Sequence, residues 1–193
     1  RLLLTARVTP AGKIERLVAL SRKAPDTMIV VDHPDNAAAL AKAARQAGVV
    51  IAVLMDVDLG FGRTGVVSVE AAEALARKIA GEPGLSFAGV QAYGGHLQHI
   101  ADYSTRLRQT QQAAQFVSAI LAAVRKTGST PSIVSGGGTG THAIDGRDGP
   151  FTEIQAGSYV FMDVEYGAID YDGRSVWPFE TALFVQCAII SVN

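Results

Sequence analysis

The sequence predicts an α/β fold: a (β/α)8 TIM-type barrel, incomplete because its first strands are missing, followed by the start of a C-terminal β domain. Apolar runs of strand length alternate with segments of helical periodicity, which is typical of parallel βα units. Six such strands are too few to close an eight-stranded barrel. Glycines and polar residues follow several successive strands, whereas an open doubly wound sheet, the alternative, gathers them at a single switch point.

The first half of the chain contains three strand-and-helix units. We expect strands at 1–7, 28–32 and 49–55, and helices at about 12–24 and 35–46 and after Ser68. Ser68 is a typical helix N-cap, and Gly48 is a plausible C-cap of the second helix. The spacing of apolar residues indicates which side chains of the first and third helices face the core, namely Ile14, Leu17, Val18, Leu20, Ala72, Leu75, Ala76 and Ile79.

The second half continues the alternation and then departs from it. Strands are expected at 87–92, 132–135 and 151–155, and a long helix at about 102–126 carries one apolar stripe. The stripe consists of Phe116, Val117, Ile120, Leu121 and Val124. A long β run at 182–192 has no helix after it. We therefore assign residues 1–180 to a partial barrel and 181–193 to the start of a β domain.

Composition excludes several classes of protein. The 17 basic and 18 acidic residues of the 193 give a net charge of −1 and form no basic run, so nucleic acid is not an expected partner. No apolar stretch reaches the roughly 18 residues that span a bilayer, so we expect no membrane insertion. The single cysteine, Cys187, lies in an apolar run and is expected to be buried, which fits a reducing, cytoplasmic setting. The first residue is not Met, which suggests a fragment of a longer protein.

A glycine-rich loop at 136–141 follows the fifth expected strand. Glycines let successive backbone N–H groups converge on an anion, and the hydroxyls of Thr139 and Thr141 add further donors. The loop therefore predicts a phosphate cradle, although it has neither the P-loop lysine nor the Rossmann glycine spacing. The alternative is a flexible glycine turn.

A second loop delivers a permanent positive charge to the end of a buried strand. Arg63 stands between Gly62 and Gly65 and could bind a carboxylate, a phosphate or a ring nitrogen. The alternative is a salt bridge to Asp56 or Asp58.

The third polar loop contains two histidines. His96 and His99 are three residues apart, with Asp102 three further on, so in a helical turn they would share a face and could bind a metal. Ordinary hydrogen-bonded histidines are the more common arrangement, and one of the two could instead act as a general base at neutral pH. Further along, Tyr159 is either a phenol that faces a ligand or an aromatic residue at the rim.

Four segments, 58–66, 91–99, 136–141 and 155–163, together resemble the D-threonine aldolase and D-serine dehydratase-like family in order, spacing and composition. Members of that family are fold-type III pyridoxal 5'-phosphate (PLP) enzymes related to alanine racemase. The resemblance implies an N-terminal barrel, a C-terminal β domain and a homodimer that shares its site between subunits.

The resemblance also implies roles for individual residues. Arg63 and Tyr93 would lie beside the cofactor ring, with Arg63 near the pyridine nitrogen, where it would keep that nitrogen unprotonated. His99 would take the proton from the β-hydroxyl of the substrate, while a divalent metal ion (Mn, Mg or Zn) polarises that oxygen. The phosphate would be held by Gly138, Thr139, Gly140 and Thr141, helped by Ser158 and Tyr159.

The implied reaction is the retro-aldol cleavage of a small D-3-hydroxy amino acid, of the D-threonine type, to glycine and an aldehyde. A dehydratase acting on D-serine or 3-hydroxyaspartate is the alternative on the same scaffold. A PLP-carrier protein without turnover and a phosphate-binding barrel without PLP are two further alternatives.

Two expected features of the family have no counterpart in this sequence. The Schiff-base lysine of the family lies near the end of the first barrel strand, whereas the lysines of this chain fall on expected helices or turns: Lys13, Lys23, Lys42, Lys78 and Lys126. The metal ligands of the family lie in the C-terminal domain. We therefore assign no metal ligand to this chain.

Overall fold

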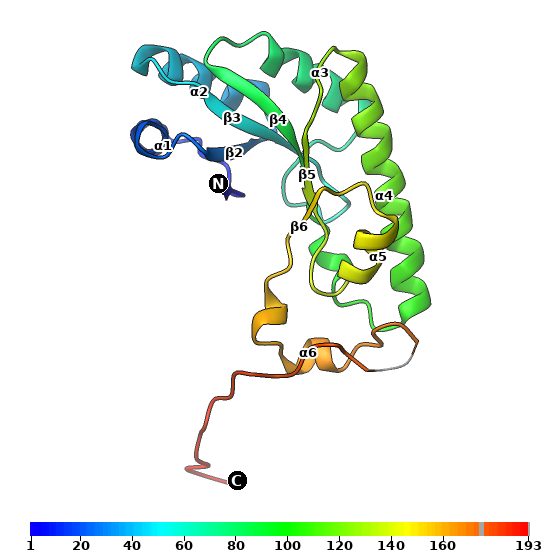
Figure 1. Ribbon diagram of the computed structural model, residues 1–193. Coiled ribbons are helices and arrows are strands. Elements are labelled where there is room, and N and C mark those ends of the chain that lie inside the picture. The colour runs from blue at the N-terminus through cyan, green and yellow to red at the C-terminus, as the bar shows by residue number, and fades with distance from the viewer. Residues whose placement is uncertain (174–175, 193) are drawn as a thin grey trace.

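A computed structural model describes residues 1–173 and 176–192. Its centre is a curled sheet of six parallel strands in the order in which they occur in the sequence (Figure 1). This sequential order excludes the doubly wound alternative, in which the strand order reverses at a switch point. The strands are β1 (Leu2–Leu4), β2 (Thr27–Val31), β3 (Ile51–Asp56), β4 (Leu85–Ala92), β5 (Ile133–Gly136) and β6 (Glu153–Ile154).

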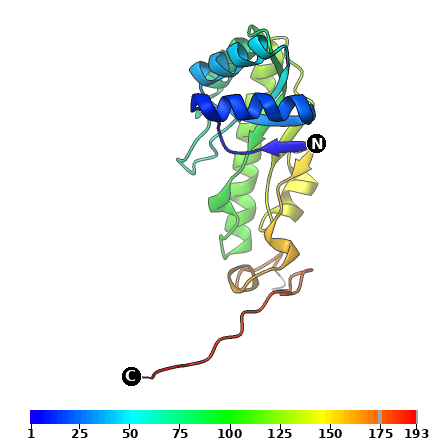
Figure 2. The same ribbon diagram turned by 90° about the vertical axis from the view of Figure 1, so that its left-hand side faces the viewer.

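Helices cover the convex side of the sheet and leave its concave side open (Figures 1 and 2). The four long helices are α1 (Ala11–Lys23), α2 (Pro34–Ala47), α3 (Val69–Ala80) and α4 (Tyr103–Lys126), which confirms the expected helices within one or two residues. The sequence did not predict the short elements, because they carry little periodicity: α5 (His142–Asp148), α6 (Val164–Gly167) and the 3-10 helices η1 (Gly95–Leu97) and η2 (Ser158–Val160). The result is the partial barrel that the sequence predicted.

The helix ends are held by specific caps. The Ser68 side chain accepts a hydrogen bond from the Ala71 N–H (3.1 Å), as expected of an N-cap. Gly48 ends α2 with φ 66°, a left-handed conformation that favours glycine. Asp102 caps α4 by accepting a hydrogen bond from the Thr105 N–H (2.7 Å). Each cap satisfies backbone groups that have no partner within their helix.

Apolar side chains pack on both faces of the sheet. The main core lies between the sheet and the helices, and it contains the predicted inward residues, except that Leu20 and Phe116 are only partly buried. A smaller apolar cluster on the concave face consists of Met28, Val30, Leu54 and Ile133. Because strand side chains alternate between faces, Ile29 and Val53 point to the helices while their neighbours point into the half-barrel.

The last part of the described chain differs from the expectation. Residues 181–192 form neither helix nor strand and are exposed, although Ala182 donates a backbone hydrogen bond to Phe161 (2.8 Å). The prediction that Cys187 is buried is wrong: the cysteine is exposed, because its apolar run packs against no core. A β domain that starts at 181 remains a prediction, and Asn193 lies outside the described residues. Within those residues, no helix combines the length and apolarity needed to cross a membrane.

Candidate functional site

On the concave face, polar side chains lie beyond the apolar cluster, at the carboxyl ends of the strands. In a strand, the residue two positions beyond an inward-facing residue also faces inward. Asp32 therefore follows Val30, Asp56 follows Leu54 and Ser135 follows Ile133. These positions form a polar layer above the apolar one.

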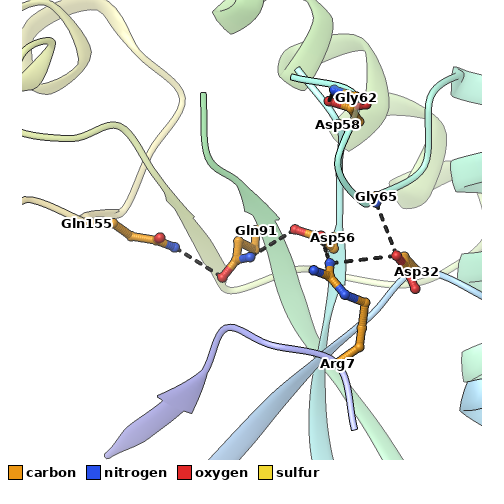
Figure 3. A network of polar contacts seen from close by, with 8 residues as sticks. All are labelled: Arg7, Asp32, Asp56, Asp58, Gly62, Gly65, Gln91 and Gln155. Atoms are coloured by element: carbon orange, nitrogen blue, oxygen red, sulfur yellow. Dashed lines mark hydrogen bonds and ion pairs between the residues drawn. The ribbon is translucent and has the colours of Figure 1, made fainter. Parts of the chain in front are cut away.

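Hydrogen bonds and ion pairs connect this layer across the half-barrel (Figure 3). Gln155, just after β6, donates through Nε2 to Gln91 Oε1 (3.2 Å). Gln91 in turn donates to Asp56 Oδ1 (2.9 Å). The guanidinium of Arg7 pairs with Asp56 and lies 3.6 Å from Asp32 Oδ2. One connected network thus runs from the segment after β1 to the segment after β6.

Burial makes the charge at Asp56 costly. Burial raises the pKa of the Asp56 carboxyl, and the hydrogen bond from Gln91 and the positive charge of Arg7 oppose that rise. A hydrogen bond with the Thr64 hydroxyl opposes it as well, whereas the nearby Asp32 adds to it. The Asp56 carboxylate is therefore maintained by the groups around it.

The loop between β3 and α3 is held by carboxylates. Asp58 Oδ1 accepts hydrogen bonds from the N–H groups of Gly60 (2.9 Å) and Phe61 (2.8 Å). Arg63 is exposed, with its guanidinium 5.4 Å from the centre of the Phe61 ring. The salt bridge from Arg63 to Asp56 or Asp58, which the sequence left open, does not occur in the part of the chain that the structure describes.

The two histidines of the β4–α4 loop face different neighbours. The His96 ring stacks on Phe61 (centroids 6.0 Å apart), whereas the His99 ring lies against Tyr166 (4.5 Å). Asp102 is occupied as the cap of α4. Residues 1–173 and 176–192 contain no group of three or more potential metal-ligating side chains. The His-x-x-His spacing therefore does not form a metal site within the described chain.

The glycine-rich loop packs closely on the loop before α4. The Gly140 N–H donates to Gln98 Oε1 (2.9 Å), and the Gly138 N–H donates to Thr141 Oγ1 (3.2 Å). Gln98 Nε2 also donates to Thr141 Oγ1 (3.1 Å). A Cβ atom on Gly140 would lie only 2.0 Å from the Gln98 carbonyl oxygen, so the close approach requires glycine. The loop is therefore a packed structure, and the amides of Gly138, Gly140 and Thr141 are already engaged.

Other donors near the same loop have no partner. Among the described residues, the N–H groups of Thr139, Gly157 and Ser158 make no hydrogen bond. The Tyr159 N–H donates to Thr139 Oγ1 (3.2 Å), which joins the glycine loop to the loop after β6. A pocket of about 370 Å³ opens at this junction, lined by Thr139, His142, Ile154, Ala156, Tyr159 and Phe179. Free amides beside a pocket form an arrangement that can bind an anion.

Tyr166 joins three of the predicted site residues. It is buried beneath His99, and burial raises its pKa, while a hydrogen bond with Ser158 lowers it and the nearby Tyr93 raises it. The fully buried Arg106 holds the neighbouring segment through Nη2, which donates to the Tyr171 carbonyl (2.9 Å). The His99 ring therefore lies against Tyr166, and Ser158 and Tyr93 are near enough to shift the pKa of its phenol.

The structure brings the predicted site residues to one edge of the sheet. Tyr93, Thr139, Ser158 and Tyr159 lie in loops that contact one another, and the loop that carries Arg63 contacts the β4–α4 loop through the stacking of Phe61 on His96. Sequence reasoning missed several polar residues of this region, namely Arg7, Asp32, Gln91, Gln98, Gln155 and Tyr166. Polar residues at the inward positions of strand ends were an available signal for Asp32, Gln91 and Gln155.

These features define a parallel α/β half-barrel with a polar site and unpartnered N–H groups at the carboxyl ends of its strands. The family model described as "Alanine racemase, N-terminal domain" matches residues 2–165, and the chain belongs to that family.

Each lysine expected on a helix or turn lies on a helix: Lys13, Lys23, Lys42, Lys78 and Lys126.

The relatives of this chain include named aldolases. The chain is 37% identical over 186 residues to D-threonine aldolase of Arthrobacter sp, covering 96% of this chain and 47% of the relative. It is 35% identical over 192 residues to 3-hydroxy-D-aspartate aldolase of Paracoccus denitrificans (strain Pd 1222), covering 98% and 50%. The chain therefore spans about half the length of these relatives.

Solved structures agree with this relationship. The crystal structure of D-threonine aldolase from Filomicrobium marinum superposes with a TM-score of 0.88 at 35% identity, covering 93% of this chain and 48% of that one. D-threo-3-hydroxyaspartate dehydratase from Delftia sp. HT23 gives a TM-score of 0.76 at 25% identity, covering 84% and 43%.

Proposed function

We propose that this chain forms the coenzyme-binding part of a PLP-dependent lyase that cleaves D-3-hydroxy amino acids of the D-threonine type to glycine and an aldehyde. The observation that carries the proposal is the meeting of the four resembling loops at one edge of the sheet, next to unpartnered amides. The aldolase relatives support the reaction class. A small D-amino acid is the proposed substrate.

The cofactor phosphate would bind between the glycine loop and the loop after β6. The unpartnered N–H groups of Thr139, Gly157 and Ser158 fit an anion there, because each can donate without breaking a hydrogen bond within the described chain. The Gly140 N–H and the Thr141 hydroxyl already bond Gln98, so their proposed role is to shape the cradle. Tyr159 lines the adjacent pocket and fits the alternative of a phenol that faces a ligand.

The ring of the cofactor would lie toward Arg63 and Tyr93. When bound, PLP supplies a ring that withdraws electrons from the substrate. Arg63 is a permanent cation on a loop linked to the β4–α4 loop, and we propose that it binds near the pyridine nitrogen. Tyr93 would flank the ring from the end of β4.

His99 is the proposed general base. Its side chain is 46% exposed, so a substrate hydroxyl can reach it, and its ring is held against Tyr166. The Glu165 carboxylate lies 3.9 Å from His99 Nδ1 and would stabilise the ring after it accepts a proton. His99 would thus take the proton from the β-hydroxyl as the carbon–carbon bond breaks.

Other parts of the site would come from outside these residues. The Schiff-base lysine and the ligands of a divalent metal (Mn, Mg or Zn) are proposed to belong to the part of the relatives that this chain does not cover. One structural relative is a mutant of a D-threo-3-hydroxyaspartate dehydratase in the metal-free form. A homodimer in a cytoplasmic setting completes the proposal.

The test uses the full-length protein with PLP and a divalent metal. It should split D-threonine but not L-threonine. His99→Ala should suppress cleavage by 100-fold or more, on the order of a lost general base, and leave PLP absorbance near 420 nm unchanged. His99→Phe is the matched control for packing, because it keeps a ring against Tyr166 but cannot accept a proton, and it should lose cleavage to the same extent. Full activity of His99→Ala would remove His99 from the mechanism.

A dehydratase is the second candidate, because a D-threo-3-hydroxyaspartate dehydratase shares the fold at 25% identity. Product analysis separates the two reactions. Glycine and an aldehyde indicate the aldolase, whereas a keto acid and ammonia indicate the dehydratase. Absence of the absorbance band in the full-length protein would instead favour a phosphate-binding barrel without PLP.

A further inference from the structure

Arg7 lies at the centre of the polar network in Figure 3. It follows β1, the first strand of the sheet, and its side chain is only 15% exposed. Its guanidinium pairs with Asp56 at the end of β3 and lies 3.6 Å from the Asp32 carboxylate at the end of β2. One cation therefore neutralises two partly buried carboxylates that approach each other.

Each of these carboxylates also holds the loop that carries Arg63. Asp32 Oδ2 accepts a hydrogen bond from the Gly65 N–H (3.1 Å). Thr64 acts on Asp56, because its side chain lowers the pKa of that carboxyl. Thr64 and Gly65 directly follow Arg63, so both carboxylates act on its side of the loop.

The loop has little room to rearrange without these bonds. Gly65 has φ +113°, and a Cβ atom there would lie 2.4 Å from the Asp58 nitrogen. The Val66 N–H donates to the Asp56 carbonyl (2.9 Å), which closes the base of the loop onto β3. The tip of the loop is held by Asp58, which accepts hydrogen bonds from the N–H groups of Gly60, Phe61 and Gly62, whereas Asp32 holds the side that follows Arg63 through the Gly65 N–H.

We propose that Arg7 is a positioning residue that orders the loop carrying Arg63, through its ion pairs with Asp32 and Asp56. Without Arg7, two carboxylates would face each other in a poorly hydrated layer. Like charges at short range favour protonation or separation, and either change weakens the hydrogen bond from the Gly65 N–H to Asp32. The role of the loop in holding PLP rests on the proposed function; the ordering of the loop does not.

The test measures amide hydrogen exchange of residues 62–66 in the full-length protein, with and without PLP. Arg7→Met should raise the exchange rate of these amides on the order of tenfold. The loss of a charge-assisted hydrogen bond shifts the local opening equilibrium by about that factor. Exchange in α4 should not change and serves as the internal reference. Arg7→Lys, which keeps the charge, should restore part of the protection.

Arg45→Met is the matched control. Arg45 pairs with Glu82 (3.2 Å) on the outer surface, so its loss removes the same charge without touching the loop. A PLP titration adds a second measurement, in which Arg7→Met should weaken binding several-fold and Arg45→Met should not. Unchanged exchange of residues 62–66 in Arg7→Met would overturn the proposal.

If Arg7→Met fails to fold, Asp32→Asn provides a second test. Asp32→Asn keeps the shape of the side chain and removes the charge that Arg7 faces. It should also raise exchange at Gly65, and wild-type protection in this variant would count against the proposal. If the wild-type protein binds no PLP, the proposed function fails while the exchange measurements still decide the role of Arg7.

Discussion

Asp145 provides a quantitative prediction about the glycine-rich loop. It lies in α5 with 4% exposure, directly behind that loop: a Cβ atom on Gly137 would be 2.7 Å from its Oδ2. Burial raises the pKa of the Asp145 carboxyl from 3.8 to about 6, although a hydrogen bond with Thr141 and the charge of His142 lower it. The native protein therefore holds this proton at a pH where the unfolded chain has released it.

The sign follows from proton linkage. Between pH 3.8 and about 6 the native state binds more protons at Asp145 than the unfolded state, so stability falls as the pH rises through this window. At about 1.4 kcal/mol per pKa unit, the total loss is about 3 kcal/mol above pH 6. Asp145→Asn removes the ionisation and keeps the size of the side chain.

The assay is urea unfolding of the wild-type protein and Asp145→Asn across the pH range from about 3.5 to 8. The stability of the variant relative to wild type should rise by about 3 kcal/mol as the pH increases. Asp148→Asn is the control, because Asp148 is exposed and its hydrogen bond with Arg147 lowers its pKa. Parallel stability curves for wild type and Asp145→Asn would refute the reasoning.

Three further substitutions test the packing and the cradle. Gly140→Ala should destabilise the protein by about 1–3 kcal/mol in urea unfolding, because its Cβ would collide with the Gln98 carbonyl; equal stability would contradict the close contact. Ser68→Ala should cost about 1 kcal/mol in the same assay through loss of the α3 cap, and a neutral result would show that the cap contributes nothing. Thr139→Val should weaken binding of inorganic phosphate about tenfold by calorimetry, since it removes the hydroxyl that accepts from Tyr159; unchanged affinity would separate Thr139 from the cradle.

The order of strands and helices was accessible from the sequence because it depends on local periodicity. An apolar run such as 49–55 predicts a buried strand whatever surrounds it, and β3 (Ile51–Asp56) begins two residues later and ends one residue later than predicted. Caps such as Ser68 and Gly48 are equally local, because they satisfy backbone groups a few residues away. The six strands and the loops at their ends follow from these signals.

The segment after residue 180 shows the limit of that reasoning. Its apolar alternation predicts a strand, but a strand also needs a partner, and residues 181–192 remain exposed within the described chain. The prediction that Cys187 is buried was wrong for the same reason. Local pattern specifies which face is apolar; it does not specify what covers it.

The sequence by itself determined a parallel half-barrel whose glycine, arginine and histidine loops follow successive strands, since strand period and turn residues act over a few positions. Only the tertiary structure decided how those loops pair. The curl of the sheet sets Arg7 between Asp32 and Asp56 and packs Gln98 onto Gly140. These partners are far apart in sequence, and their contacts depend on register and curvature, which no local pattern encodes.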